Sequence, residues 1–62
     1  MRYVYIFMKN KEIHKCFSSM KKAKCYVCNV YGPLTVGYDS EDLFVAWSAD
    51  KDSIIIHRYD LV

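Results

Sequence analysis

The stretch HKCFSSMKKAKCYVC, residues 14–28, contains the change from strand to helix that decides the fold. Phe17 ends a short run in which apolar and polar side chains alternate, as they do in a half-buried strand. Ser18 and Ser19 follow, and their hydroxyls can accept hydrogen bonds from the free backbone N–H groups of a first helical turn. From Met20 onward the apolar residues recur at helical spacing. The stretch therefore predicts a strand end, a serine cap and a helix.

The predicted helix ends before Gly32 and Pro33, because glycine suits the C-terminal cap and proline cannot continue the helix. Its apolar side consists of Met20, Ala23, Val27, Val30 and Tyr31. Segments rich in β-branched and aromatic residues, separated by polar turns, predict strands on both sides of the helix. They span residues 2–8, 13–17, 34–38, 43–47 and 53–59, and 34–38 has the least regular pattern. We therefore predict a single α+β domain over residues 1–62. Its order is ββαβββ, or ββαββ without segment 34–38, with one helix packed on an antiparallel sheet.

The composition indicates a small folded domain in a reducing compartment. The chain has 62 residues, 53% of them hydrophobic and 16% aromatic, which is near the lower size limit for a stable core. Its apolar runs are too short for a membrane-spanning helix, and its start lacks the features of a signal peptide. Three cysteines, an odd count, argue against a closed set of disulfides. We expect a cytoplasmic protein with no membrane partner.

Charge is unevenly distributed along the chain. Residues 1–31 carry seven lysines and arginines against one glutamate, whereas residues 32–62 carry two basic residues against six acidic ones. If both halves fold into one domain, many of these charges will face one another.

Four residues have the side chains of a Cys₃His zinc site, namely His14, Cys16, Cys25 and Cys28. Cys25 points away from the apolar side of the predicted helix, and His14 and Cys16 lie opposite the apolar pair of their strand. The two half-sites would then lie on opposite faces of the domain. We therefore predict no metal and no cofactor, with a zinc-stabilised mini-domain as a remote alternative. We also predict no catalytic residues, because no nucleophile, paired-carboxylate or phosphate-loop motif is present.

Two surfaces are candidates for binding a partner. In the first strand Val4, Ile6 and Met8 share one face, and Tyr3, Tyr5 and Phe7 share the other. One helix covers one face of a small sheet, and we expect it to cover the aliphatic set. The uncovered face would then carry Tyr3, Tyr5, Phe7, His14, Cys16, Ile55, His57 and Tyr59. Such an aromatic face is typical of a protein contact, either with a partner or with a second copy in a homodimer.

The second candidate surface consists of Lys21, Lys22 and Lys24 in the first turns of the helix. Basic residues there oppose the helix dipole, which favours acidic groups by ~0.3–1 kcal/mol each. They indicate an acidic partner, or simply a solvated face. The alternative function is a small nucleic-acid-binding regulator that uses these lysines and exposed tyrosines, although the net charge is only +2.

The first half of the chain resembles small phage-encoded accessory proteins, which have an aromatic strand, a polar turn, a strand ending in Phe-Ser-Ser, and a helix. The matching residues are Phe17, Ser18, Ser19, Lys21, Ala23 and Tyr26, and the closing Tyr59-Asp60-Leu61 is also in keeping. The resemblance implies host takeover or anti-defence by binding and blocking a bacterial protein. We therefore expect a non-enzymatic, phage-derived inhibitor or modulator of a host protein, acting in the host cytoplasm through protein–protein interaction.

Overall fold

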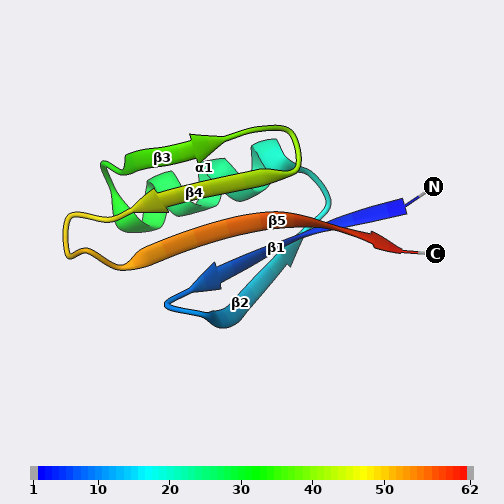
Figure 1. The fold of residues 1–62 in the computed structure, drawn as a ribbon, viewed down its shortest axis with the longest axis horizontal. Helices are drawn as coiled ribbons and strands as arrows, with labels where there is room; N and C mark the ends of the chain where they lie inside the picture. The colour runs from blue at the N-terminus through cyan, green and yellow to red at the C-terminus, as the bar shows by residue number, and fades with distance from the viewer. Residues whose placement is uncertain (1, 62) are drawn as a thin grey trace.

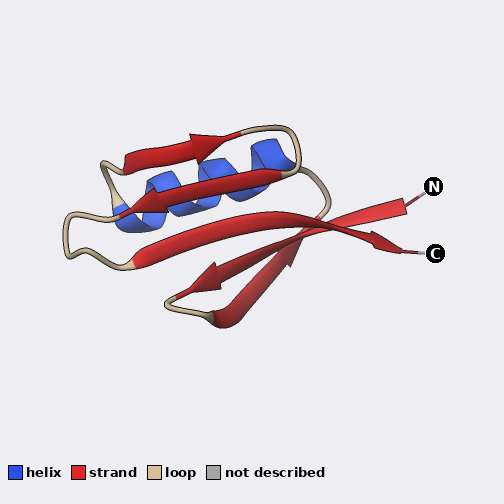
Figure 2. Ribbon diagram, in the orientation of Figure 1, coloured by secondary structure: helices blue, strands red, loops and turns tan. Residues whose placement is uncertain are grey.

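The computed structural model describes residues 2–61 and has two layers, a five-stranded antiparallel sheet and one helix packed on one of its faces (Figures 1 and 2). The elements in chain order are β1 (Arg2–Lys9), β2 (Glu12–Phe17), α1 (Met20–Tyr31), β3 (Thr35–Asp39), β4 (Leu43–Trp47) and β5 (Ser53–Leu61). The predicted α+β class and the order ββαβββ are confirmed. The segment with the least regular pattern forms the edge strand β3.

The strands lie in the order β2-β1-β5-β4-β3, so the first and last strands of the chain are neighbours in the centre of the sheet. β1 pairs with β5 along its whole length, from Arg2 opposite Leu61 to Lys9 opposite Ile54. Their outer ends extend beyond the helix, and both chain termini lie there (Figure 1). The molecule measures 36 × 19 × 18 Å.

The helix begins and ends as its sequence predicts. Ser19 is the N-cap, and its hydroxyl accepts a hydrogen bond from the backbone N–H of Lys22 at 3.2 Å. At the other end Gly32 has φ +73°, a left-handed conformation that glycine adopts without steric cost. Its N–H donates to the carbonyl of Cys28 at 3.1 Å. These bonds satisfy one backbone group at each end of α1.

The core lies between α1 and the sheet, and both layers contribute apolar side chains to it. Its fully or almost fully buried members are Phe7, Ala23, Val27, Phe44, Ala46, Ile54 and Ile56. The Phe7 ring makes edge-on contacts with Tyr26 and Tyr31, at centroid distances of 5.9 and 5.8 Å. Ala23 and Val27 are the completely buried residues of the helix in this core.

The predicted assignment of the β1 faces is therefore wrong. Phe7 is completely buried beneath α1, and Tyr5 packs against the same core, whereas Val4, Ile6 and Met8 face away from the helix. Both sets of β1 side chains are apolar, so alternation alone could not assign them to a face. Of the aromatic set, Phe7 is completely buried against the helix rings of Tyr26 and Tyr31, whereas Tyr3 keeps 38% of its surface exposed.

A bulge in the β1–β2 pair changes where His14 lies. Phe7 is opposite Lys15 and Met8 is opposite Ile13, which leaves His14 as the extra residue. The imidazole lies 5.6 Å from the Phe7 ring, on the helix side of the sheet. The prediction that His14 lies on the uncovered face is therefore also wrong.

Candidate functional site

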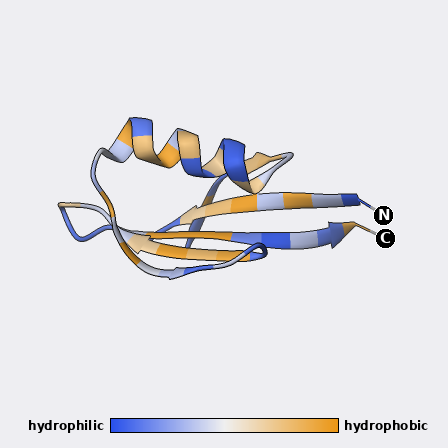
Figure 3. Ribbon diagram, turned by 90° about the horizontal axis from the view of Figure 1, so that it is seen from above, coloured by the Kyte–Doolittle hydropathy of each residue, from blue (hydrophilic) through white to orange (hydrophobic). Residues whose placement is uncertain are grey.

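The candidate site is the face of the sheet that α1 leaves open, which we call the uncovered face. In Figure 3 the helix lies on one side of the strands only. The strand pairing places these residues on the uncovered face: Arg2, Val4, Ile6, Met8, Ile13, Cys16, Thr35, Tyr38, Leu43, Val45, Trp47, Ser53, Ile55, His57, Tyr59 and Leu61. Most are apolar.

One row of this face crosses all five strands without a polar side chain other than the hydroxyl of Tyr38. It runs from the edge strand β3 to the edge strand β2 through Tyr38, Val45, Ile55, Met8 and Ile13. The row beside it consists of Leu43, His57, Ile6 and Cys16. A sheet usually buries one face and solvates the other, and its solvated face alternates with polar side chains. Here the centres of both faces consist of apolar side chains.

Charge separates the two faces. Among the strand residues on the uncovered face, the only formally charged side chain is Arg2, at the outer end of β1. The helix side is framed by ion pairs, with Lys24 2.6 Å from Asp39 and Arg58 3.3 Å from Asp60. Removing an uncharged surface from water costs little free energy, because no ion has to be desolvated.

The uncovered face has a shallow hollow of about 400 Å³ beside β5. Tyr38, Leu43, His57 and Tyr59 line it, and the His57 and Tyr59 rings lie 5.1 Å apart. The hollow also meets the rim residues Asp42, Arg58 and Asp60. Aromatic rings around a hollow with a polar rim are the usual composition of an interaction hot spot.

The Trp47 ring on the uncovered face lies against Gly37 of the neighbouring strand. A Cβ atom on Gly37 would lie 2.7 Å from Cη2 of the Trp47 ring, closer than real Cβ atoms approach carbon. The glycine therefore makes room for the ring, which still has 42% of its surface exposed. Trp47 is the only tryptophan of the chain, so the protein has a natural fluorescent reporter on this face.

The structure separates the predicted binding residues into two groups. His57, Tyr59 and Cys16 lie on the uncovered face, as expected. Tyr3 and Tyr5 lie on the helix side, where the Arg58 guanidinium stacks 4.4 Å from the centre of the Tyr3 ring. The face that Tyr3, Tyr5 and Phe7 were expected to form is instead made by the alternate β1 residues and by β4.

Sequence reasoning did not assign Val45 and Trp47 to this face. The segment LFVAW alternates, and the small Ala46 between them marks the side that packs closely under a helix. That signal was available in the sequence. The position of Tyr38 depends on a bulge at Gly37, which the sequence alone does not reveal.

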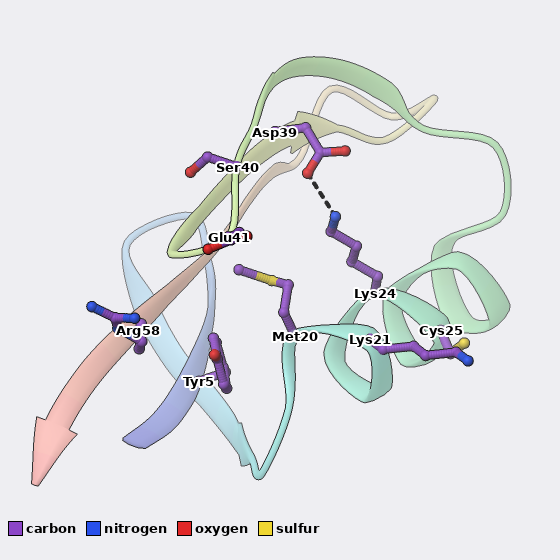
Figure 4. A pocket seen from close by; sticks show the side chains of 9 residues that line it. All are labelled: Tyr5, Met20, Lys21, Lys24, Cys25, Asp39, Ser40, Glu41 and Arg58. Carbon is purple, nitrogen blue, oxygen red and sulfur yellow. Dashed lines mark hydrogen bonds and ion pairs between the residues drawn. The ribbon is translucent and has the colours of Figure 1, made fainter. Parts of the chain in front are cut away.

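The predicted lysine surface is divided by internal contacts (Figure 4). Lys24 turns toward the sheet, pairs with Asp39 and lies 5.2 Å from the centre of the Phe44 ring. Lys22 reaches the Ser18 hydroxyl at 3.3 Å. The Lys24–Asp39 pair joins the basic first half to the acidic second half, as the charge asymmetry predicts. Lys24 therefore stabilises the fold, and a partner would have to compete with Asp39 for it.

An open hollow of about 750 Å³ lies beside this pair, between the start of α1 and the β3–β4 turn. Figure 4 shows the Met20 side chain pointing into it from the helix, with Tyr5 and Arg58 on the strand side. Lys21, Cys25, Ser40 and Glu41 complete the lining together with Lys24 and Asp39. Charges of both signs are mixed here, so the hollow does not select an anion or a cation.

The three cysteines are free, exposed and distributed over both sides of the molecule. Cys16 lies on the uncovered face, while Cys25 and Cys28 lie on α1. Within residues 2–61 no three histidine, cysteine or acidic side chains are grouped closely enough to hold a metal ion. The thiols are thus useful as independent reporters of the two sides.

No family model matches the sequence, and no curated protein or solved structure matches it. In the described part of the chain, no helix is long and apolar enough to cross a membrane.

Proposed function

We propose that the protein is a non-enzymatic protein-binding module that docks on a protein of a bacterial host through its uncovered face, and thereby inhibits or redirects it. The observation that carries the proposal is the apolar row across all five strands, which no element of residues 2–61 covers. Exposed apolar patches of this kind are typical of protein contact sites. The resemblance of residues 3–27 to phage accessory proteins supports a host protein as the target.

The surface chemistry favours a protein over a nucleic acid. Binding a phosphate backbone needs several free cations, since neutralised phosphates supply most of the affinity. The uncovered face has no lysine among its strand residues, and Lys24 of the helix is paired with Asp39. The exposed Tyr38 and Tyr59 rings instead offer large, rigid contact area at low entropic cost.

Capture from bacterial lysate tests the proposal with two matched substitutions. Val45→Lys places a charge in the middle of the apolar row, and Val30→Lys places the same charge on an exposed position of α1. We expect wild type and Val30→Lys to capture the same proteins in the same amounts. Val45→Lys should capture at least about tenfold less of each, since burying an unpaired charge raises the free energy of binding. Quantitative mass spectrometry measures the captured proteins.

The opposite pattern would contradict the proposal. Unchanged capture by Val45→Lys together with lost capture by Val30→Lys would assign the contact to the helix side. Circular dichroism of each variant checks that a loss of capture does not reflect a loss of fold.

A further inference from the structure

We infer that the uncovered face is occupied in the free protein by a second copy of this chain, in a twofold dimer whose sheets pack face to face. The inference rests on the proposed function in one respect, because it assigns the same surface to self-association and to binding of the host target. A host target would then take over the face from the second copy.

The exposed apolar residues are concentrated on the uncovered face. Five of the eight large hydrophobic residues that are exposed lie on this one face: Ile13, Tyr38, Trp47, Tyr59 and Leu61. In the plane of Figure 1 the molecule measures 36 × 19 Å. A face of that outline offers several hundred Å², the scale of the about 800 Å² that each partner contributes to a standard interface.

The strand residues at the centre of the uncovered face carry no formal charge. A twofold axis brings a surface against itself, so any charge near the centre of the surface meets its own like charge. The centre of the uncovered face consists of Ile6, Val45, Ile55 and the imidazole of His57. Among the strand residues of this face the one formal charge, Arg2, lies at the outer end of β1, and Asp42 lies at the rim of the hollow. The face can therefore meet a copy of itself without like charges in contact. Contact between two helix sides would cost more free energy, because their ion pairs would have to be desolvated.

The edges of the sheet, strands β2 and β3, are the alternative route to self-association. The edge strand β2 carries Glu12 and Lys15, and a bulge interrupts its pairing with β1. The other edge, β3, has a bulge at Gly37 and ends in Asp39. Charges and bulges on edge strands discourage the addition of another strand. Self-association is thus directed to the face.

The described part of the chain has only two layers, one helix and one sheet. A 62-residue chain with one helix buries its core on one side of the sheet only. Domains of this size commonly need a second source of burial, and oligomerisation is one of the usual sources. Two sheets packed about 10 Å apart would place a second core between them, in a helix–sheet–sheet–helix arrangement.

The test is the mass of the purified protein in solution, measured by sedimentation equilibrium over a dilution series. We expect wild type and Val30→Lys to have twice the 7.3 kDa mass of the chain at the upper end of the series. We expect Val45→Lys to raise the midpoint concentration of association at least about tenfold, because two unpaired charges would meet across the axis. Tyr38→Lys, at an exposed edge position, should act in the same direction if Val45→Lys proves unstable.

Trp47 supplies a second readout on the same samples. Its emission should shift to shorter wavelength as wild type associates, because the half-exposed ring becomes buried, and the shift should follow the mass curve. Val45→Lys should lack the shift at concentrations where wild type and Val30→Lys show it.

A monomeric mass for wild type up to about 0.1 mM, where even a micromolar association is saturated, would overturn the inference. So would masses that rise without limit, or association that Val45→Lys and Tyr38→Lys leave unchanged. Monomeric wild type whose lysate capture is sensitive to Val45→Lys refutes the second copy and keeps the proposed function. A dimer whose capture is insensitive to Val45→Lys supports the second copy and refutes target binding through this face.

Discussion

The two faces of the sheet are both apolar at their centres, but their surroundings differ. The helix side holds Phe7, Phe44 and Ile56 in a row that is closed above by α1 and at its ends by charged side chains. The opposite side holds Ile6, Val45 and Ile55 with no helix above them. The difference shows that an apolar strand face becomes core only where another element covers it. The face left over keeps the composition of a core and is available for another molecule.

The largest expected effect comes from two neighbours in β1 that point to opposite faces. Phe7→Ala should destabilise the domain by about 3–5 kcal/mol, since it empties the space beneath α1. Ile6→Ala removes a half-buried side chain from the uncovered face and should cost only about 1 kcal/mol. Urea unfolding of dilute samples measures both. Equal losses for the two variants would mean that the faces do not differ as described.

A second comparison concerns the two glycines. Gly37→Ala should cost about 1–3 kcal/mol and change the Trp47 emission, because the new methyl group displaces the ring. Gly32→Ala meets no atom within 4 Å, so it should leave the Trp47 emission unchanged and cost about 1–3 kcal/mol through the backbone alone, because φ +73° with ψ −147° is a conformation that side chains rarely adopt. Thermal unfolding followed by tryptophan fluorescence separates them. An unaltered Trp47 spectrum in Gly37→Ala would contradict the packing of the ring.

Substitutions at the N-cap measure how much the cap stabilises α1, the helix that covers one face of the sheet. Ser19→Ala removes the acceptor for the Lys22 N–H and should cost about 1 kcal/mol. Ser18→Ala, one residue earlier, loses only a contact with the Lys22 side chain and should be close to neutral. Far-ultraviolet circular dichroism during thermal unfolding measures the difference, and a reversed order would place the cap at Ser18.

The smallest effect is expected at the ion pair beside α1. Lys24→Gln should change the free energy of unfolding by less than about 1 kcal/mol, because both partners are partly exposed. The change should shrink further when salt is added, since screening weakens exposed pairs. A loss of several kcal/mol in urea unfolding would give this pair a much larger structural role than the geometry indicates.

Much of the fold could be predicted from local signals. Ser19 and Gly32 fix the ends of the helix, and the polar turns separate the strands. The choice between the two faces of β1 could not be predicted, because it depends on packing against the helix, where the Phe7 ring contacts Tyr26 and Tyr31. The locations of His14 and Tyr38 depend on bulges, which reflect pairing between distant strands. His57 and Tyr59 were placed correctly because they alternate with Ile54 and Ile56 in one long strand.

Thiol reactivity tests the central claim most directly, because one cysteine lies on the uncovered face and two lie on the helix. Alkylation of the reduced protein, resolved residue by residue by mass spectrometry, should show Cys16 reacting more slowly in concentrated than in dilute samples. Cys25 and Cys28 should react at the same rate in both. If none of the three alkylation rates changes with concentration, or if protection is confined to Cys25 and Cys28, self-association through the uncovered face is contradicted.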